Sequence, residues 1–257
     1  MTSILHGKFV WYELYTPDAP AARRFYCEVL GWDDRDGEVP GIDYHILSIG
    51  GTDIAGSMQA DPGAPPGWNG YIAVDDINAA AAKAQAAGAT AVIPVSPIPG
   101  VGHFAMLLDP QGACFGLLEY ADDFPRKPKS LPDHGMQGHG WWRELHTTGD
   151  GEQALKFYQD QFGWPETRRM PMPPDNFYAI LGEGAGHSGL FRDTEAPASY
   201  WLYYFWVDDI DAAQTKVEKA GGKIIHDLME VPGGAWVLHA KDPQGVVFAL
   251  VGDRAKK

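Results

Sequence analysis

Two glutamates are the side chains of this sequence best suited to chemistry. Glu13 and Glu144 occupy the same place in two related stretches, FVWYELYT and GWWRELHT. Both stretches alternate in the way of β-strands, so each glutamate shares a strand face with the tryptophan two positions before it. A carboxylate there can act as a general base when burial raises its pKa. We name both as candidate catalytic residues; the alternative is a carboxylate that caps a backbone N–H or meets solvent.

His146 follows Glu144 at strand spacing, which places both side chains on one face of the strand. Such a pair supplies half of a metal site. The first stretch has Tyr15 where the second has His146, so a site of this kind would exist in one half only. A noncatalytic histidine is the simpler interpretation, and we assign neither a metal ligand nor a cofactor.

Aromatic and polar side chains at matched places are candidates for lining a pocket. His103 and Trp236 precede the last strand of each half, where their rings could stack on a ligand or bond to it, although ordinary sheet residues are the alternative. For the tryptophans at equivalent positions of the two halves, core packing is the alternative to ligand binding. The histidines His45, His187, His226 and His239 show no ligand spacing. The candidate substrate-binding residues are Trp11, Asn69, His103, Trp142, His146 and Trp236.

These residues belong to a unit that the chain contains four times. In each copy an apolar strand leads to a capping aspartate, a helical apolar stripe and a closing glycine, and three short strands follow. The turn DPQG precedes the last strand of each half. An internal repeat of this kind decides the architecture, and we predict an α+β fold of four βαβββ units. The capping aspartates are Asp18, Asp76, Asp150 and Asp209.

The charge composition disfavours some classes of binding partner. The chain has 34 acidic and 20 basic residues, a net charge of −14, and this sign disfavours nucleic acid and anionic membranes. Neither a signal peptide nor an apolar run long enough for a membrane span is evident, so we expect a cytoplasmic protein. We predict two domains, at 1–120 and 138–253, joined by a proline-containing linker at 121–137. Whether two chains form a homodimer is left open.

The stretch Tyr15–Trp32, with its Asp, Ala-Ala, Phe-Tyr and Leu-Gly-Trp, resembles the opening of the vicinal oxygen chelate superfamily. That superfamily includes glyoxalase I, bleomycin-resistance proteins and extradiol dioxygenases, and the DPQG turns are similar to its closing strands. Tandem members that the sequence resembles include actinobacterial hydroxylase-like proteins and relatives of a 27 kDa antigen. The resemblance implies tandem vicinal-oxygen-chelate domains, whose four βαβββ modules form two cup-shaped sheets with ligands bound inside.

The resemblance also implies where a metal would be held. Tryptophan, leucine, glycine and alanine offer no lone pair to a metal, and asparagine offers one weak oxygen. The segments 54–58 and 188–191 contain no carboxylate or histidine. The resemblance therefore implies a member that lacks the usual metal ligands. The positions concerned are Trp11, Asn69 and Gly116 in the first half, and Trp142, Leu202 and Ala249 in the second.

Three functional hypotheses follow. The first is a metal-independent protein that binds a small apolar or aromatic molecule in its cups. A stronger version of this hypothesis is that the protein also converts the molecule. The second is a metal-dependent lyase, isomerase or dioxygenase with non-standard ligands such as Glu144 and His146. The third is a protein-interaction role through the outer surface. Fold analogy alone does not choose among them.

Overall fold

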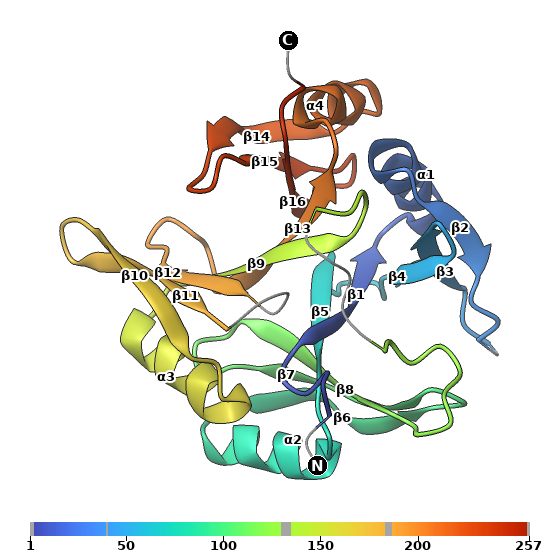
Figure 1. Ribbon diagram of the computed structural model, residues 1–257. Coiled ribbons are helices and arrows are strands. Elements are labelled where there is room, and N and C mark those ends of the chain that lie inside the picture. The colour runs from blue at the N-terminus through green and yellow to red at the C-terminus, as the bar shows by residue number, and fades with distance from the viewer. Residues whose placement is uncertain (1–2, 40, 130–134, 183–186, 256–257) are drawn as a thin grey trace. The chain divides into compact units, whose positions relative to one another are not determined.

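Four copies of one βαβββ module make up the chain (Figure 1). The computed structural model describes residues 3–39, 41–129, 135–182 and 187–255. The modules of the first half are β1 (Phe9–Thr16), α1 (Ala19–Leu30), β2 (Asp33–Asp36), β3 (Tyr44–Ile49) and β4 (Thr52–Gln59), then β5 (Gly67–Ala73), α2 (Ile77–Ala86), β6 (Thr90–Ile98), β7 (Gly102–Leu108) and β8 (Cys114–Tyr120).

The second half repeats this order. Its modules are β9 (Gly140–Thr147), α3 (Gly151–Phe162), β10 (Glu166–Met172), β11 (Asn176–Leu181) and β12 (Ser188–Arg192), then β13 (Tyr200–Val207), α4 (Ile210–Lys219), β14 (Lys223–Glu230), β15 (Trp236–Lys241) and β16 (Val247–Gly252). The α+β prediction is confirmed.

Two eight-stranded mixed sheets result. Their strand orders, β2-β3-β4-β1-β5-β8-β7-β6 and β10-β11-β12-β9-β13-β16-β15-β14, match strand for strand. In each module the first strand runs parallel to the last strand, and the other pairs are antiparallel hairpins. A right-handed helix crossover joins parallel strands most readily, which is why each helix follows the first strand of its module.

The helix boundaries lie where the sequence predicts them. The carboxylate of Asp18 accepts the Ala21 backbone N–H, and the other three predicted caps accept N–H groups in the same way. Gly31 and Gly163 end α1 and α3 with positive φ values of 74° and 68°. A left-handed residue at this point satisfies the last helical carbonyls, and glycine adopts it without steric cost.

The chain divides into two compact units, each of which takes one module from each sequence half. The first unit contains Met1–Val10, Gly70–Leu131 and Arg143–Trp201, and the second contains Trp11–Asn69, Pro132–Trp142 and Leu202–Lys257. The sequence domains at 1–120 and 138–253 follow the repeat rather than these contacts and stay a prediction. Residues 130–134 of the predicted linker lie outside the described residues.

The repeated motifs hold the modules of each unit together. In the first unit the buried Tyr158 hydroxyl donates to Asp109 Oδ2 at 3.0 Å and accepts from the Trp201 indole N–H at 3.0 Å. Gln111 of the same DPQG turn donates to the Asp150 carbonyl at 2.6 Å, at the start of α3. The Phe-Tyr, DPQG and Trp motifs are thus structural. The second unit repeats these bonds in the counterparts Tyr26, Asp242, Trp68, Gln244 and Asp18.

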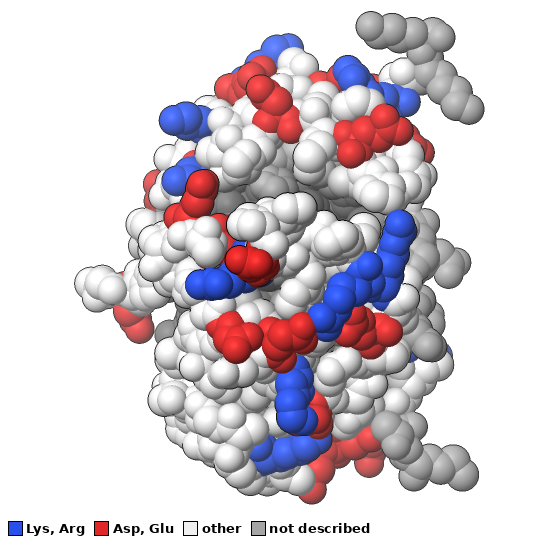
Figure 2. Space-filling view, turned by 90° about the vertical axis from the view of Figure 1, so that its left-hand side faces the viewer, with Lys and Arg blue, Asp and Glu red and all other residues white. Residues whose placement is uncertain are grey.

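Charged side chains of both signs are interspersed on the face drawn in Figure 2. Among the described residues, helices that could cross a membrane by length and hydropathy do not occur. The expected lack of nucleic-acid and membrane partners stays a prediction.

Candidate functional site

Strand β9 presents Glu144 and His146 on one face, as their spacing predicts. His146 Nε2 lies 2.9 Å from Glu144 Oε1, and His146 Nδ1 lies 2.9 Å from Asp193 Oδ2. The Tyr200 ring stacks on the imidazole with centroids 4.5 Å apart, and its hydroxyl is 3.2 Å from Nδ1. Phe191 contacts the imidazole edge to face. The histidine is therefore enclosed by two carboxylates and two aromatic rings.

The two carboxylates set the charge of this imidazole. Burial lowers the pKa of His146, but its hydrogen bonds to Glu144 and Asp193 and their negative charges outweigh burial, and the pKa is raised overall. Burial alone would raise the pKa of Asp193, whereas the bonds from His146 and from two backbone N–H groups lower it. The arrangement favours the imidazolium form, in which both N–H groups donate to the carboxylates. In this state neither ring nitrogen offers a lone pair to a metal.

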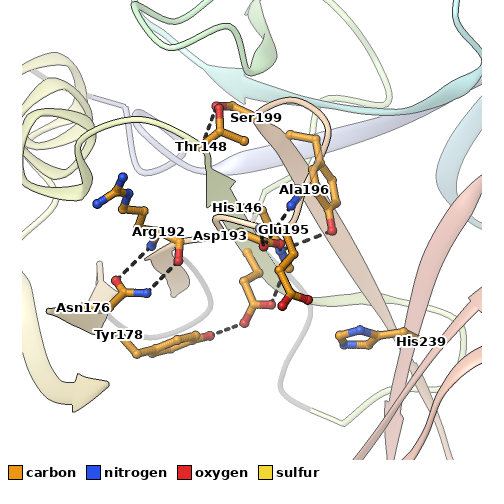
Figure 3. Close-up of polar contacts among 12 residues, drawn as sticks. His146, Thr148, Asn176, Tyr178, Arg192, Asp193, Glu195, Ala196, Ser199 and His239 are labelled. Atoms are coloured by element: carbon orange, nitrogen blue, oxygen red, sulfur yellow. Dashed lines mark hydrogen bonds and ion pairs between the residues drawn. The ribbon is translucent and has the colours of Figure 1, made fainter. Parts of the chain in front are cut away.

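The loop that carries Asp193 is fixed at both ends (Figure 3). The Asn176 amide donates to the Arg192 carbonyl at 2.6 Å on one side. On the other, the Ser199 hydroxyl accepts the Thr148 N–H at 3.0 Å. These bonds position the carboxylate against His146.

Glu144 has a second partner, which β11 supplies. The Tyr178 hydroxyl donates to Glu144 Oε2, and Gly189 of β12 lies opposite Glu144 in the parallel ladder. Glu144 is only 8 % exposed. The tyrosine comes from a strand 34 residues along the chain, and the Glu144–His146 spacing gave no sign of it.

The first half repeats this cluster with a phenol in place of the imidazole. The Tyr15 hydroxyl donates to Glu13 Oε2 at 2.6 Å, and Trp11 Nε1 donates to the Tyr44 hydroxyl at 3.1 Å. Burial, followed by the negative charge of Glu13, raises the pKa of Tyr44 well above its usual value. A Cβ at Gly56, opposite Glu13, would lie 1.9 Å from the Tyr44 hydroxyl oxygen. A residue with a Cβ at this position would have to displace the Tyr44 ring.

The other predicted residues have different surroundings. His103 is exposed on β7 and lies opposite Glu119. Trp236 is half-buried on β15, and the Arg254 guanidinium lies 4.6 Å from its ring centroid. Asn69 and Trp142 are half-buried in β5 and β9. Their assignment to ligand binding stays a prediction, as do the catalytic roles of Glu13 and Glu144.

Two of the metal positions implied by the resemblance, Gly116 and Ala249, have tyrosine side chains beside them. A Cβ added at Gly116 would come within 2.4 Å of the Tyr71 ring, which covers the position where a glutamate would project. At the counterpart Ala249, the neighbouring strands carry Tyr204 and His239, and Tyr204 Oη lies 2.8 Å from His239 Nε2. In the described part of the chain, no three His, Cys, Asp or Glu side chains are grouped to hold a metal.

Comparison with known proteins identifies the family. The model of the glyoxalase/bleomycin resistance protein/dioxygenase superfamily matches residues 8–116 and 145–250. The chain belongs to this superfamily. It is 31% identical to CFP32 of Mycobacterium tuberculosis, a protein named as a glyoxylase, over 94% of this chain and 93% of that protein. It is 26% identical to the anthracycline biosynthesis protein DnrV of Streptomyces peucetius, over 98% of this chain and 95% of that protein.

Solved structures support the fold of the superfamily. An Mn(II)-bound glyoxalase from Novosphingobium aromaticivorans matches with a TM-score of 0.69 at 16% identity, covering 98% of this chain and 83% of that one. The 2,3-dioxygenase LapB of Pseudomonas sp. KL28 matches with a TM-score of 0.70 at 14% identity, covering 96% and 92%. At these identities the likeness extends to the fold alone.

Proposed function

We propose that this chain binds a small apolar or aromatic molecule in its cup-shaped sheets without the metal used elsewhere in its superfamily. The proposal rests on the residues found at the metal-ligand positions of the closing strands, Gly116 and Ala249. The Tyr71 ring covers Gly116 in the first half, and Ala249 stands between a hydrogen-bonded tyrosine and histidine in the second. A carboxylate ligand is missing from both places, and at Gly116 it would displace a ring.

The side chains of the two glutamate clusters support an aromatic ligand. Around Glu13 and Glu144, tyrosine and tryptophan rings carry polar edges that hydrogen-bond while their faces remain apolar. Ligand pockets usually combine such faces with a few placed polar groups. An aromatic ligand is also in keeping with the anthracycline biosynthesis named for one relative. If the molecule is converted as well as bound, Glu13 and Glu144 are the proposed bases.

The metal-dependent hypothesis is less well supported. It needs His146 as a neutral ligand, whereas each of its nitrogens lies 2.9 Å from a carboxylate oxygen and its pKa is raised. A metal would have to displace a proton and break at least one charge-assisted bond.

Calorimetric titration with 2-naphthol, in the presence and absence of EDTA, tests the proposal. We expect saturable binding with the same affinity in both buffers. Trp11→Ala and Trp142→Ala are counterparts in the repeat, so each serves as the control that shows which half binds. Binding that requires an added divalent metal would contradict the proposal, as would an affinity that neither variant changes.

A further inference from the structure

The first compact unit contains a cavity of about 340 Å³ that the glutamate clusters do not line. It lies where the parallel strands β5 and β8 end, beside the segment that precedes β1 and the turn that leads to α2. Its volume falls within the range of small-molecule pockets, about 300–1,000 Å³. The polar residues that line it are Ser3, His6, Asp75, Glu119, Asp122 and Lys127.

The second half has larger and smaller residues at two lining positions. Ala73 lines the cavity at the end of β5, and its counterpart at the end of β13 is Trp206, which pairs with β16 in the same register. Trp206 is 9% exposed, and a Cβ added at Gly135 would lie 3.4 Å from its ring. Gly252 stands at the place of Glu119. The space beside Ala73 and the carboxylate of Glu119 are therefore features of the first half.

Glu119 brings a fixed negative charge to the cavity. Its Oε2 accepts the Ile77 backbone N–H, at the start of α2, at 2.8 Å. Among the described residues no cationic side chain forms an ion pair with it, and this includes His103, which stands opposite on β7. In the second half the counterpart N–H of Ile210 donates to the Asp253 backbone carbonyl at 3.0 Å. The helix can thus begin without a glutamate.

Asp75 is the second carboxylate of the cavity wall. Its two oxygens accept the Ser3 backbone N–H at 3.1 and 3.2 Å. His6 Nδ1 lies 3.4 Å from Oδ2 and accepts the Asp75 backbone N–H at 3.3 Å. In the second half Gln137 Oε1 accepts the Asp208 N–H at 2.8 Å in the same way. An amide oxygen can only accept, so the shared role indicates a neutral His6 that leaves the charge of Asp75 uncompensated.

The rest of the wall favours an organic cation. Lys127 Nζ lies 3.8 Å from Asp122 Oδ1, so these two charges offset each other. Tyr120 adds an aromatic ring, which stacks on Phe124 with centroids 5.6 Å apart. In the described part of the chain, His, Cys, Asp and Glu side chains are not grouped in threes as a metal site requires. Carboxylates beside an aromatic ring suit a cation with an apolar body.

We propose that this cavity binds a small organic cation that carries a primary ammonium group. The ammonium has three N–H donors, and the carboxylates of Glu119 and Asp75 accept from it in charge-assisted hydrogen bonds. The alkyl or aryl body of the ligand lies against Tyr120 and Leu5, which also line the cavity. The site is separate from the cups, and the proposal is independent of the small-molecule binding proposed for them.

Calorimetric titration with phenethylammonium at neutral pH tests the proposal, and 2-phenylethanol is the uncharged probe with the same body. We expect saturable binding of the ammonium and binding of the alcohol that is weaker by at least about tenfold. Glu119→Gln keeps an oxygen for the Ile77 N–H but removes the charge, so it should weaken ammonium binding at least about tenfold. Asp123→Asn removes an equal charge from a residue that does not line the cavity, and it should change the affinity by less than about twofold.

Ala73→Trp installs the second-half residue and should abolish ammonium binding, whereas Trp11→Ala and Trp142→Ala should leave it unchanged. Wild-type protein that does not bind the ammonium, equal affinity for the alcohol, or an unchanged affinity in Glu119→Gln or in folded Ala73→Trp would overturn the proposal. Loss of ammonium binding in either tryptophan variant would do the same, because it would place the probe in a cup. Titration with 2-naphthol measures cup binding separately, so these outcomes leave the proposed function intact.

Discussion

Replacement of His146 should destabilise the protein in a pH-dependent way. His146→Ala removes the imidazole that contacts both Glu144 and Asp193, whose side chains are 11% and 21% exposed. Loss of one partner of a buried ion pair costs about 3–5 kcal/mol. The partial exposure of Asp193 favours the lower end, so we expect a loss of about 3 kcal/mol near neutral pH.

His146→Tyr is the matched variant, because Tyr15 stands at this place in the first half and bonds to Glu13 at 2.6 Å. The new phenol can bond to Glu144 in the same way. A hydrogen bond to a charged group contributes about 1.5–3 kcal/mol, so this variant should recover part of the loss.

The pH dependence has a defined sign. The folded pKa of His146 is raised, so its contribution is complete below the unfolded pKa of about 6.5 and is lost as pH rises through the folded value. The folded pKa of Asp193 is lowered, so its contribution is present above about pH 4 and is lost as pH falls through the folded value. Urea unfolding followed by circular dichroism from about pH 2 to about pH 9 measures both slopes, the Asp193 slope at the acid end and the His146 slope at the alkaline end. Wild-type stability in His146→Ala, or an unchanged alkaline slope, would refute this reasoning.

Two further predictions concern packing and thiol reactivity. Gly56→Ala should displace the Tyr44 hydroxyl and lower the free energy of unfolding in urea by about 1–3 kcal/mol. Gly67→Ala is the control, because an added Cβ there meets open space, and it should leave the free energy of unfolding nearly unchanged. Equal effects of the two substitutions would contradict the role given to Gly56. Burial raises the pKa of Cys27 and Cys114 to about 11. Iodoacetamide should therefore modify both thiols far more slowly than free cysteine in mildly alkaline buffer, as measured by mass spectrometry. Labelling at the rate of free cysteine would contradict this prediction.

The fold follows from the sequence because its signals are local and repeated. Each capping aspartate accepts a backbone N–H group within its own helix, and Gly31 and Gly163 adopt the left-handed conformation that ends a helix. Such signals act over a few residues and can be read without tertiary information. The recurrence along the chain reappears in the two sheets, whose strand orders match strand for strand.

Only part of the candidate site can be predicted from the sequence. The strand spacing places Glu144 beside His146, but Tyr178 and Asp193 come from other strands and loops. The repeat could have revealed one of them. Tyr178 is the counterpart of Tyr44, which lies beside Glu13 in the first half, and it stands 134 positions after Tyr44. The two glutamates are 131 positions apart, so an alignment of the halves without a gap does not pair the two tyrosines.

His226 and His239, which are paired across β14 and β15, show a different limit of prediction from sequence. His226 and His239 have no ligand spacing along the chain, because cross-strand neighbours in a hairpin can lie at any separation that the turn allows. The comparison that reveals them is with Ile93 and Met106 at the same places in the first half.

The metal content of the purified protein tests the central claim most directly. Protein prepared without chelator or a metal-affinity tag would be measured by elemental mass spectrometry, before and after incubation with Fe²⁺, Mn²⁺, Ni²⁺ and Zn²⁺ followed by desalting. The occupied positions at Gly116 and Ala249 predict metal far below stoichiometric in every sample. Stoichiometric metal that is lost in Glu144→Ala or His146→Ala would contradict the account and establish a metal site built from those residues.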